Sequence, residues 1–326
     1  MKRAMQTLGF RCRFIPLLIV ASLIAGICIG ACSNSKCAKQ QSDNGTDSLN
    51  AGHEQMAKEL NEYVNGKPDA LIGVAVITDH DDVVTVNGND EFPMMSVMKF
   101  PLALAVAKWL ECNEMSIDDS IAIKADELNE NTYSPMLKKY GRNDMSISIR
   151  ETLEWSLTES DNNACDILIK LTGGTDSTMS LLREMGLADG ISICASEEDM
   201  YRNNELSYLN RSTPLAMARL FERFDKELRN SNESFAQIAS MLEKCRTGSD
   251  RLAKPLADSR ATIGHKTGTG FVKPDGRLMA LNDCGYIHLP DNTNYYIAIF
   301  VADSGYDAET TSKIIADISE IVYNNL

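Results

Sequence analysis

The chain has 326 residues, of which 44% are hydrophobic and 24% charged, a composition typical of a globular protein with a large core. Its net charge is −14, and the charged residues among the first thirty are four cations, Lys2, Arg3, Arg11 and Arg13. Subtracting these four positive charges from −14 leaves −18 for the rest, which argues against nucleic acid or an anionic membrane surface as partner.

The chain begins with the pattern of an export signal. Basic residues precede an apolar, uncharged stretch over 14–29, which is short for a membrane span. The stretch ends in Ile-Gly-Ala just before Cys32, and this resembles a bacterial lipobox. The resemblance implies a signal peptide over 1–31 and a lipid anchor on Cys32. Ordinary signal cleavage nearby is the alternative, and either predicts an exported, periplasmic protein.

Residues 32–50 are polar and predict a flexible tether, after which a domain occupies 51–326. Export permits disulfides, but their pairing cannot be deduced from the sequence. The cysteines beyond the signal show neither Cys-x-x-Cys nor the Cys/His spacing of a zinc site. They are Cys37, Cys112, Cys165, Cys194, Cys245 and Cys284. We therefore expect no metal and no cofactor.

Hydrophobic periodicity divides the domain into elements. A helix is expected at 54–64, a buried strand at 71–78 and its hairpin partner at 82–86. The middle is mostly helical, with amphipathic stretches at 97–111, 148–158, 162–171, 176–185 and 214–228. Strands return at 261–267, 278–288 and 295–302, and a helix over 307–323 closes the chain.

This order predicts an α+β fold of two lobes. The terminal segments, 51–95 and 246–326, would form one antiparallel sheet lobe, with 96–245 inserted as a helical lobe. Active sites favour the seam between such lobes.

The first candidate catalytic pair is Ser96 and Lys99. If a helix begins at about Val97, both side chains lie on one face, and the helix N-terminus favours developing negative charge. A lysine kept neutral by its surroundings can take the proton of a serine and make it a nucleophile. Because Ser33 and Lys36 in the tether have the same spacing, the spacing alone carries little weight.

A second candidate is Ser160-Asp161-Asn162, which follows a helix-like stretch. The hydroxyl of Ser160 could pass a proton to a leaving nitrogen, and the amide of Asn162 could bind a substrate carbonyl. The structural alternative is a loop or a helix cap, because serine, aspartate and asparagine all favour such positions.

A third candidate is Lys266-Thr267-Gly268-Thr269, at the end of a strand-like run. A cation beside a hydroxyl suits a ligand carboxylate lying along a strand edge, and Gly268 would let that ligand approach the backbone closely. A turn without function is the alternative. His265 is interpreted as a packed or partly exposed strand residue without a role.

The three motifs occur in the order Ser-x-x-Lys, Ser-Asp-Asn, Lys-Thr-Gly, separated by 64 and 106 residues. This ordered set is typical of class A β-lactamases and penicillin-binding proteins. From about Asn50 to its end, the chain resembles a class A β-lactamase, and within that family the subgroup of Bacteroides-type bacteria and related extended-spectrum enzymes. The resemblance implies a five-stranded antiparallel sheet flanked by helices and joined to a helical lobe.

The resemblance also implies the catalytic roles. Ser96 would be the acylated nucleophile, Lys99 its proton partner and Ser160 the donor to the lactam nitrogen. The backbone amides of Ser96 and Thr269 would form the oxyanion hole, directed at charge that appears only in the transition state.

Substrate-binding residues follow from the same resemblance: Asn162, Lys266, Thr267, Gly268 and Thr269. Tyr133 is similar to the family's aromatic residue at the cleft rim, with an ordinary surface aromatic as the alternative. Arg251 is the candidate for a second carboxylate anchor, with a surface arginine at a helix end as the alternative.

A hydrolase also needs a carboxylate that activates the deacylating water, and Glu197 and Glu205 compete for this role. In the family this glutamate lies on a loop that ends in a Thr-Pro step. Thr213-Pro214 supplies such a step, and Glu197 lies 17 residues before the proline, the usual offset. The offset favours Glu197.

Departures from the family pattern indicate a modified loop. Tyr201 replaces an asparagine that also holds the water in most members. Asp166 stands where asparagine is usual, and Asn210 where aspartate is usual. This exchanged pair is a mark of the subgroup and predicts a loop held by different hydrogen bonds. Ala103 occupies the position of the family's common disulfide partner.

The sequence therefore predicts a serine β-lactamase that hydrolyses penicillins and cephalosporins and confers antibiotic resistance. We expect it to act as a monomer on a small-molecule β-lactam. The main alternative is a penicillin-binding D,D-peptidase or transpeptidase, or a β-lactam-sensing domain, that is acylated without turnover. Whether Lys99 or Glu197 is the base for acylation stays open.

Overall fold

The structure, a computed structural model, describes residues 43–79, 82–228 and 233–326, with side chains from residue 52 on. Two units are distinguished, Met1–Asp47 and Ser48–Leu326. The predicted signal peptide, Cys32 and the start of the predicted tether lie outside the described residues. Helix α1 (Asp43–Asn65) takes in 43–50, so the end of the stretch expected to be flexible is helical. No proline separates it from the periodic stretch that follows, and an established helix propagates easily.

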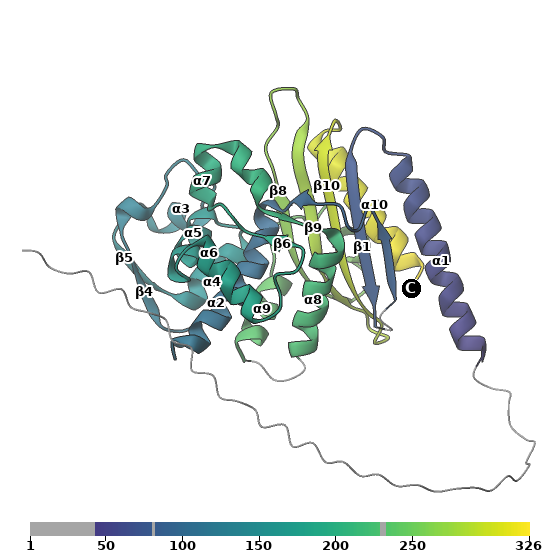
Figure 1. Cartoon of the computed structure of the whole chain (residues 1–326), viewed down its shortest axis with the longest axis horizontal. Helices are drawn as coiled ribbons and strands as arrows, with labels where there is room; N and C mark the ends of the chain where they lie inside the picture. The colour runs from purple at the N-terminus through teal and green to yellow at the C-terminus, as the bar shows by residue number, and fades with distance from the viewer. Residues whose placement is uncertain (1–42, 80–81, 229–232) are drawn as a thin grey trace, which may run out of the picture. The chain divides into compact units, whose positions relative to one another are not determined.

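Five antiparallel strands form the main sheet in the order β2-β1-β10-β9-β8 (Figure 1). They are β1 (Leu71–Thr78), β2 (Val83–Val86), β8 (Thr262–Thr269), β9 (Leu278–His288) and β10 (Asn294–Ser304). Every predicted strand is present within two residues of these bounds. Because β1 pairs with β10, the two ends of the domain share one sheet, which confirms the predicted fold class.

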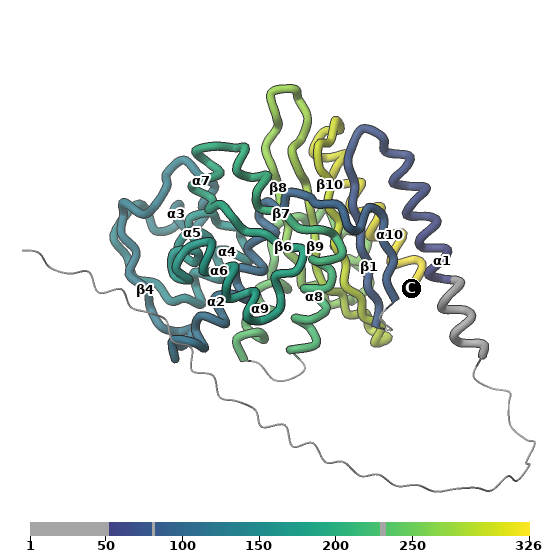
Figure 2. Tube along the Cα trace, viewed as in Figure 1, coloured from purple at the N-terminus to yellow at the C-terminus, as the bar shows by residue number. Residues whose placement is uncertain are grey.

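Alternate side chains of β10 serve two cores, because successive residues of a strand point to opposite faces. Tyr296 and Phe300 pack in the core shared with the helical segments. Ile297 and Ile299 pack against α1 and α10 (Ala308–Asn324) in a second core. Helices α1 and α10 cover that face side by side (Figure 2), and Asn325 Nδ2 donates to Glu59 Oε2 at 2.9 Å.

Eight helices lie between β2 and β8 in the described part of the chain. They are α2 (Lys99–Cys112), α3 (Pro135–Tyr140), α4 (Ile149–Thr158), α5 (Asn162–Leu171), α6 (Thr175–Glu184), α7 (Glu197–Arg202), α8 (Pro214–Leu228) and α9 (Glu233–Glu243). Helix α2 is apolar on nearly all sides and forms the centre of this block. Helix α8 packs on β1, β9 and β10, so it covers the sheet although its residues were assigned to the helical lobe.

Short elements complete the chain: β3 (Phe92–Pro93), β4 (Ser120–Ile123), β5 (Met145–Ser148), β6 (Ile191–Ser192), β7 (Arg211–Ser212), and the 3-10 turns η1 (Met95–Met98), η2 (Ala125–Glu127), η3 (Asn204–Leu209) and η4 (Lys254–Leu256). Strands β3, β7 and β6 form a small sheet that ties the start of η1 to the segment around α7. Among the helices that the structure describes, none is long and apolar enough to cross a membrane.

Candidate active site

A cleft of about 470 Å³ lies between the helical segments and β8, the edge strand of the main sheet. The predicted site residues that line it are Ser96, Tyr133, Ser160, Asn162, Glu197, Thr267 and Thr269. Lys99 and Lys266 lie fully buried behind this lining. Of the two competing acids, Glu197 lines the cleft and Glu205 is an exposed residue of η3.

Ser96 lies in the 3-10 turn η1, and the α-helix begins only at Lys99, two residues later than the sequence predicted. Residues three apart eclipse in a 3-10 turn, so Ser96 and Lys99 remain on one side. Met95, just before the serine, has φ +50°, a left-handed conformation that costs a non-glycine residue about 1–2 kcal/mol. Asn282 of β9 donates to the Met94 carbonyl at 3.1 Å and helps to hold this turn.

The buried Lys99 ammonium joins three parts of the site. It donates to Ser160 O at 2.8 Å and Asn162 Oδ1 at 2.7 Å, and lies 3.0 Å from Glu197 Oε1. Burial alone would lower the pKa of Lys99, but Glu197 and the other acidic groups around it together raise the pKa above its usual value. The resting site therefore holds a charged lysine, whereas the sequence argument assumed a neutral amine.

The side chain of Ser160 contacts the second buried lysine, Lys266. Lys266 Nζ donates to Ser160 Oγ at 3.0 Å and to Thr267 O at 3.0 Å. Burial lowers the pKa of Lys266 to about 8, and the positive charge of Lys99 acts in the same direction. Ser160 itself has φ +59°, which turns its carbonyl and its hydroxyl toward different lysines. A hydroxyl beside an ammonium group can donate a proton and be resupplied.

Asn162 and Asp161 serve the cleft and the fold together. Asn162 Nδ2 donates to Thr132 Oγ1 at 2.8 Å, which fixes the amide in the cleft wall. Asp161 caps α5 by accepting from Ala164 N at 2.8 Å. The helix-cap interpretation of this motif is therefore also correct. Tyr133 is 53% exposed at the edge of the same cleft.

Gly268 lets β8 approach the serine turn. A Cβ added there would lie 2.4 Å from the Met94 carbonyl oxygen and 3.2 Å from Met95 Cβ. The chain's own backbone is thus a close neighbour of Gly268.

Replacing Gly268 with alanine is expected to push β8 away from η1. Overpacking of this kind typically costs about 1–3 kcal/mol, and the Lys266–Ser160 contact should lengthen. Thermal unfolding and cephalosporin hydrolysis should both fall. Gly52→Ala is the matched control. Gly52 lies inside helix α1, and its added Cβ would meet no atom closer than the Asn325 carbonyl oxygen, at 3.4 Å. Equal behaviour of the two variants would contradict the close-approach argument.

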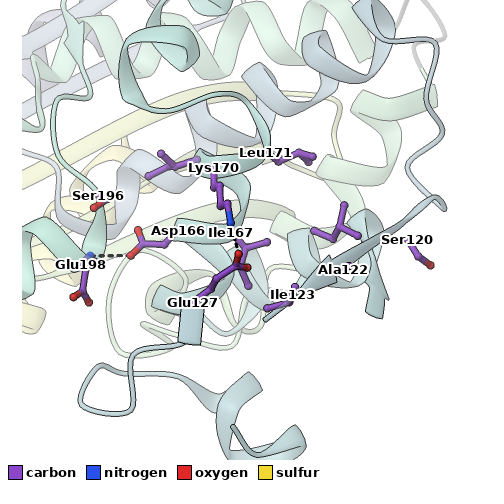
Figure 3. A pocket seen from close by; sticks show the side chains of 12 residues that line it. Ser120, Ala122, Ile123, Glu127, Asp166, Ile167, Lys170, Leu171, Ser196 and Glu198 are labelled. Atoms are coloured by element: carbon purple, nitrogen blue, oxygen red, sulfur yellow. Dashed lines mark hydrogen bonds and ion pairs between the residues drawn. The ribbon is translucent and has the colours of Figure 1, made fainter. Parts of the chain in front are cut away.

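Glu197 is the first residue of α7, and Asp166 of α5 supports it from behind. The two carboxylate oxygens of Asp166 accept the backbone amides of Glu197 at 2.7 Å and Glu198 at 2.8 Å. Figure 3 shows Asp166 directed at Glu198 along the wall of a neighbouring pocket of about 710 Å³. Burial, with the nearby charge of Glu197, raises the pKa of Asp166 to about 7.

Asp166 should therefore make stability depend on pH. Its pKa is raised on folding, so its favourable contribution is complete below about pH 4 and is lost as the pH rises through about 7. The Asp166→Asn side chain cannot ionise. Between pH 5 and pH 8 the unfolding free energy of wild type should therefore fall by about 2 kcal/mol relative to that of the variant. Thermal or denaturant unfolding across that range measures the difference. A gap that stays constant with pH would contradict this assignment.

Asn210 holds the other end of the same loop. It is fully buried; its Oδ1 accepts from Cys194 N at 2.7 Å and Ala195 N at 2.9 Å, and its Nδ2 donates to Ala195 O at 2.8 Å. Asp166 and Asn210, the pair exchanged relative to the family pattern, thus hold two separate parts of the loop. Asp166 binds the start of helix α7, and Asn210 binds the turn before it.

Arg251 is buried, so the surface-arginine alternative is wrong. Its guanidinium donates to Thr269 Oγ1 at 2.9 Å and to the carbonyls of Gly268 and Asn282, both at 3.2 Å. Burial lowers the pKa of Arg251. The Arg251 guanidinium therefore hydrogen-bonds within the protein, and it fixes the position of the Thr269 hydroxyl.

Sequence reasoning missed Thr247. Its Oγ1 lies 2.5 Å from Thr267 Oγ1, and both residues line the cleft. No motif surrounds Thr247 in the sequence, and only the fold places it beside the Lys-Thr-Gly strand. Tyr201, half exposed, also lines the cleft at the position where most members carry asparagine.

A fold of this kind, with Ser-x-x-Lys, Ser-Asp-Asn and Lys-Thr-Gly motifs around one cleft, defines a serine β-lactamase or penicillin-binding enzyme. Residues 55–326 match the model of the Beta-lactamase enzyme family. The chain belongs to this family, and it is a class A serine β-lactamase, an enzyme that hydrolyses β-lactams.

Individual relatives agree. A β-lactamase of Bacteroides uniformis is 38% identical over 83% of this chain and 90% of its own length. Beta-lactamase VEB-1 of Pseudomonas aeruginosa is 36% identical over 84% of this chain and 91% of its own. Among solved structures, the TLA-1 extended-spectrum β-lactamase superposes with a TM-score of 0.80 at 34% identity, covering 84% of this chain and 99% of its own. A class A β-lactamase of Bacteroides cellulosilyticus superposes with a TM-score of 0.79 at 33% identity, and the match covers 84% of this chain and 98% of that one.

Proposed function

We propose that Ser96 attacks the lactam carbonyl, and that a water activated by Glu197 then hydrolyses the resulting ester. The observation that carries this proposal is the Lys99 ammonium, whose contacts at 2.7–3.0 Å join Glu197, Ser160 and Asn162 beside Ser96. One small cleft thereby holds a nucleophile, a carboxylate and a second hydroxyl, the groups that two-step acyl transfer requires.

In the acylation step, the Ser96 oxygen forms a bond to the lactam carbonyl carbon and its proton passes through water to Glu197. The raised pKa of Lys99 supports this route, because an ammonium cannot accept a proton. Lys99 instead stabilises the alkoxide that develops on Ser96. The carbonyl oxygen would receive hydrogen bonds from the backbone amides of Ser96 and Thr269.

The lactam nitrogen leaves with a proton from Ser160. Lys266 donates to that hydroxyl and, with a pKa of about 8, can replace the lost proton. The proton that Glu197 took from Ser96 passes to Lys266, which restores the carboxylate and the ammonium. In the second step Glu197 takes a proton from water, the water oxygen attacks the ester carbonyl, and Ser96 leaves with that proton. The enzyme then returns to its resting state.

The substrate carboxylate would bind at the strand end of the cleft. Thr267 and Thr269 offer two hydroxyls there, and the buried Lys266 supplies a cation behind them. Gly268 keeps the strand close to the serine. Arg251 would act through Thr269, since its guanidinium is bonded within the protein. Asn162 would bind the substrate amide carbonyl, and Tyr133 would border the rim.

We propose both penicillins and cephalosporins as substrates, which the names of the extended-spectrum relatives support. We further propose an exported, periplasmic monomer, with Cys32 as the residue that carries lipid. The pattern of residues 1–32 supports this localisation.

The full chain, mixed with a large excess of a chromogenic cephalosporin, should hydrolyse many equivalents at a constant rate, followed by absorbance. Benzylpenicillin should be consumed as well. A burst of one equivalent followed by no further reaction would instead indicate a penicillin-binding protein that is acylated without turnover.

A further inference from the structure

Three ionisable side chains that the proposed reaction does not use lie next to the cleft. His265 Nδ1 is 2.8 Å from Asp283 Oδ1, and both residues are buried on the neighbouring strands β8 and β9. The His265 ring also lies close enough to the Cys245 thiol for each to shift the pKa of the other. The order thiol, imidazole, carboxylate is the arrangement that activates a cysteine nucleophile.

The charges of the three groups support one another. Burial would raise the pKa of Cys245, but His265 and Lys266 outweigh it and lower that pKa to about 7. Burial would lower the pKa of His265, but Asp283 and Cys245 raise it to about 10. Arg251 also lies within electrostatic range of Cys245. A thiolate beside an imidazolium is therefore well populated at neutral pH.

We propose that Cys245 is a modification site, a nucleophilic thiolate that reacts with low-molecular-weight disulfides and related thiol-transferring reagents, and that the adduct weakens substrate binding at Thr267. In the exchange, the Cys245 sulfur forms a bond to one sulfur of the reagent, and the other sulfur leaves as a thiolate from a disulfide or as a sulfinate from a thiosulfonate. The reagent is the oxidant, and the leaving anion passes to solvent. A reducing thiol reverses the reaction.

The coupling to the cleft runs through Thr247. Cys245 Sγ lies 3.4 Å from Thr247 Oγ1, which in turn lies 2.5 Å from Thr267 Oγ1. The backbone around them is tight, since a Cβ on Gly248 would lie 2.5 Å from Thr267 Cγ2. An added methylthio group must displace Thr247, and Thr267 then loses its partner. This consequence rests on the proposed role of Thr267 in binding the substrate carboxylate.

The test is methyl methanethiosulfonate, a small reagent that transfers a methylthio group, on the full chain at pH 6. Peptide mass mapping of one sample compares Cys245 with Cys194, which is more exposed. We expect Cys245 to react about 5-fold faster, because its thiolate fraction outweighs its lower nucleophilicity. kcat/KM should fall about 3- to 10-fold, mostly through KM, and dithiothreitol should restore it.

Cys245→Ser is the matched control, because its hydroxyl can keep the contact with Thr247 and the variant should retain activity in the reagent. Faster labelling of Cys194 would overturn the nucleophile assignment, whatever the activity. Labelling of Cys245 with unchanged kcat/KM would overturn the coupling to Thr267. A chain that hydrolyses no β-lactam would contradict the proposed function, while the mapping result would still decide the reactivity of Cys245.

Discussion

Ser96→Ala is expected to lower kcat/KM for a chromogenic cephalosporin by about four to six orders of magnitude, because no other group in the cleft can form the acyl bond. The loss should appear with penicillins too, and intact mass should show no adduct after mixing. The fold should persist, because the turn around Ser96 is held by the contact of Asn282 with Met94.

Ser120→Ala, at an exposed residue of β4, is the matched control and should keep wild-type kinetics. If Ser96→Ala retained activity within about tenfold of wild type, a loss smaller than removal of a nucleophile causes, another residue would have to carry the nucleophilic attack.

Glu197→Gln is expected to slow steady-state hydrolysis by about 10²- to 10⁴-fold, the usual contribution of a general base. The amide keeps the size of the side chain but cannot take a proton from water. Acylation, which has a second possible base in Lys99 once its countercharge is gone, should suffer less, so the acyl-enzyme should accumulate. Rapid mixing with absorbance detection should show a burst of about one equivalent followed by slow turnover.

The rival acid supplies the control for this experiment. Glu205 is exposed on η3, and Glu205→Gln should leave both the burst and the turnover unchanged. A slow Glu205→Gln beside a normal Glu197→Gln would assign the deacylating role to the other acid and contradict the assignment made from the distance to Pro214.

Long elements with strong periodicity were predictable from the sequence. Strand β9 and helices α5 and α8 match the expected bounds, because their apolar spacing reflects the faces that they bury. Helix α7 has six residues and was missed, since a single capped turn leaves no periodic signal. The first turn before Lys99 is 3-10 instead of α because tertiary contacts at Met94 and Met95 constrain it.

The sequence predicted the identities of the site residues better than their charges and contacts. Three motifs at characteristic separations identified Ser96, Ser160 and Lys266, and the structure brings them into one cleft. The charge of Lys99 depends on a carboxylate 98 positions away in the sequence and 3.0 Å away in space, so no local pattern reveals it. The same holds for Thr247, which becomes part of the cleft only through Thr267.

The most direct measurement is peptide mapping of Glu197→Gln after it is mixed with a cephalosporin and quenched with acid. The account predicts a mass increase equal to the opened substrate, or to its core after loss of the leaving group, on the peptide that contains Ser96. Wild type, quenched at the same time, should carry little adduct because it has already released product. An adduct on another residue, or slow turnover without any adduct, would contradict the claim that Ser96 carries the acyl group and Glu197 frees it.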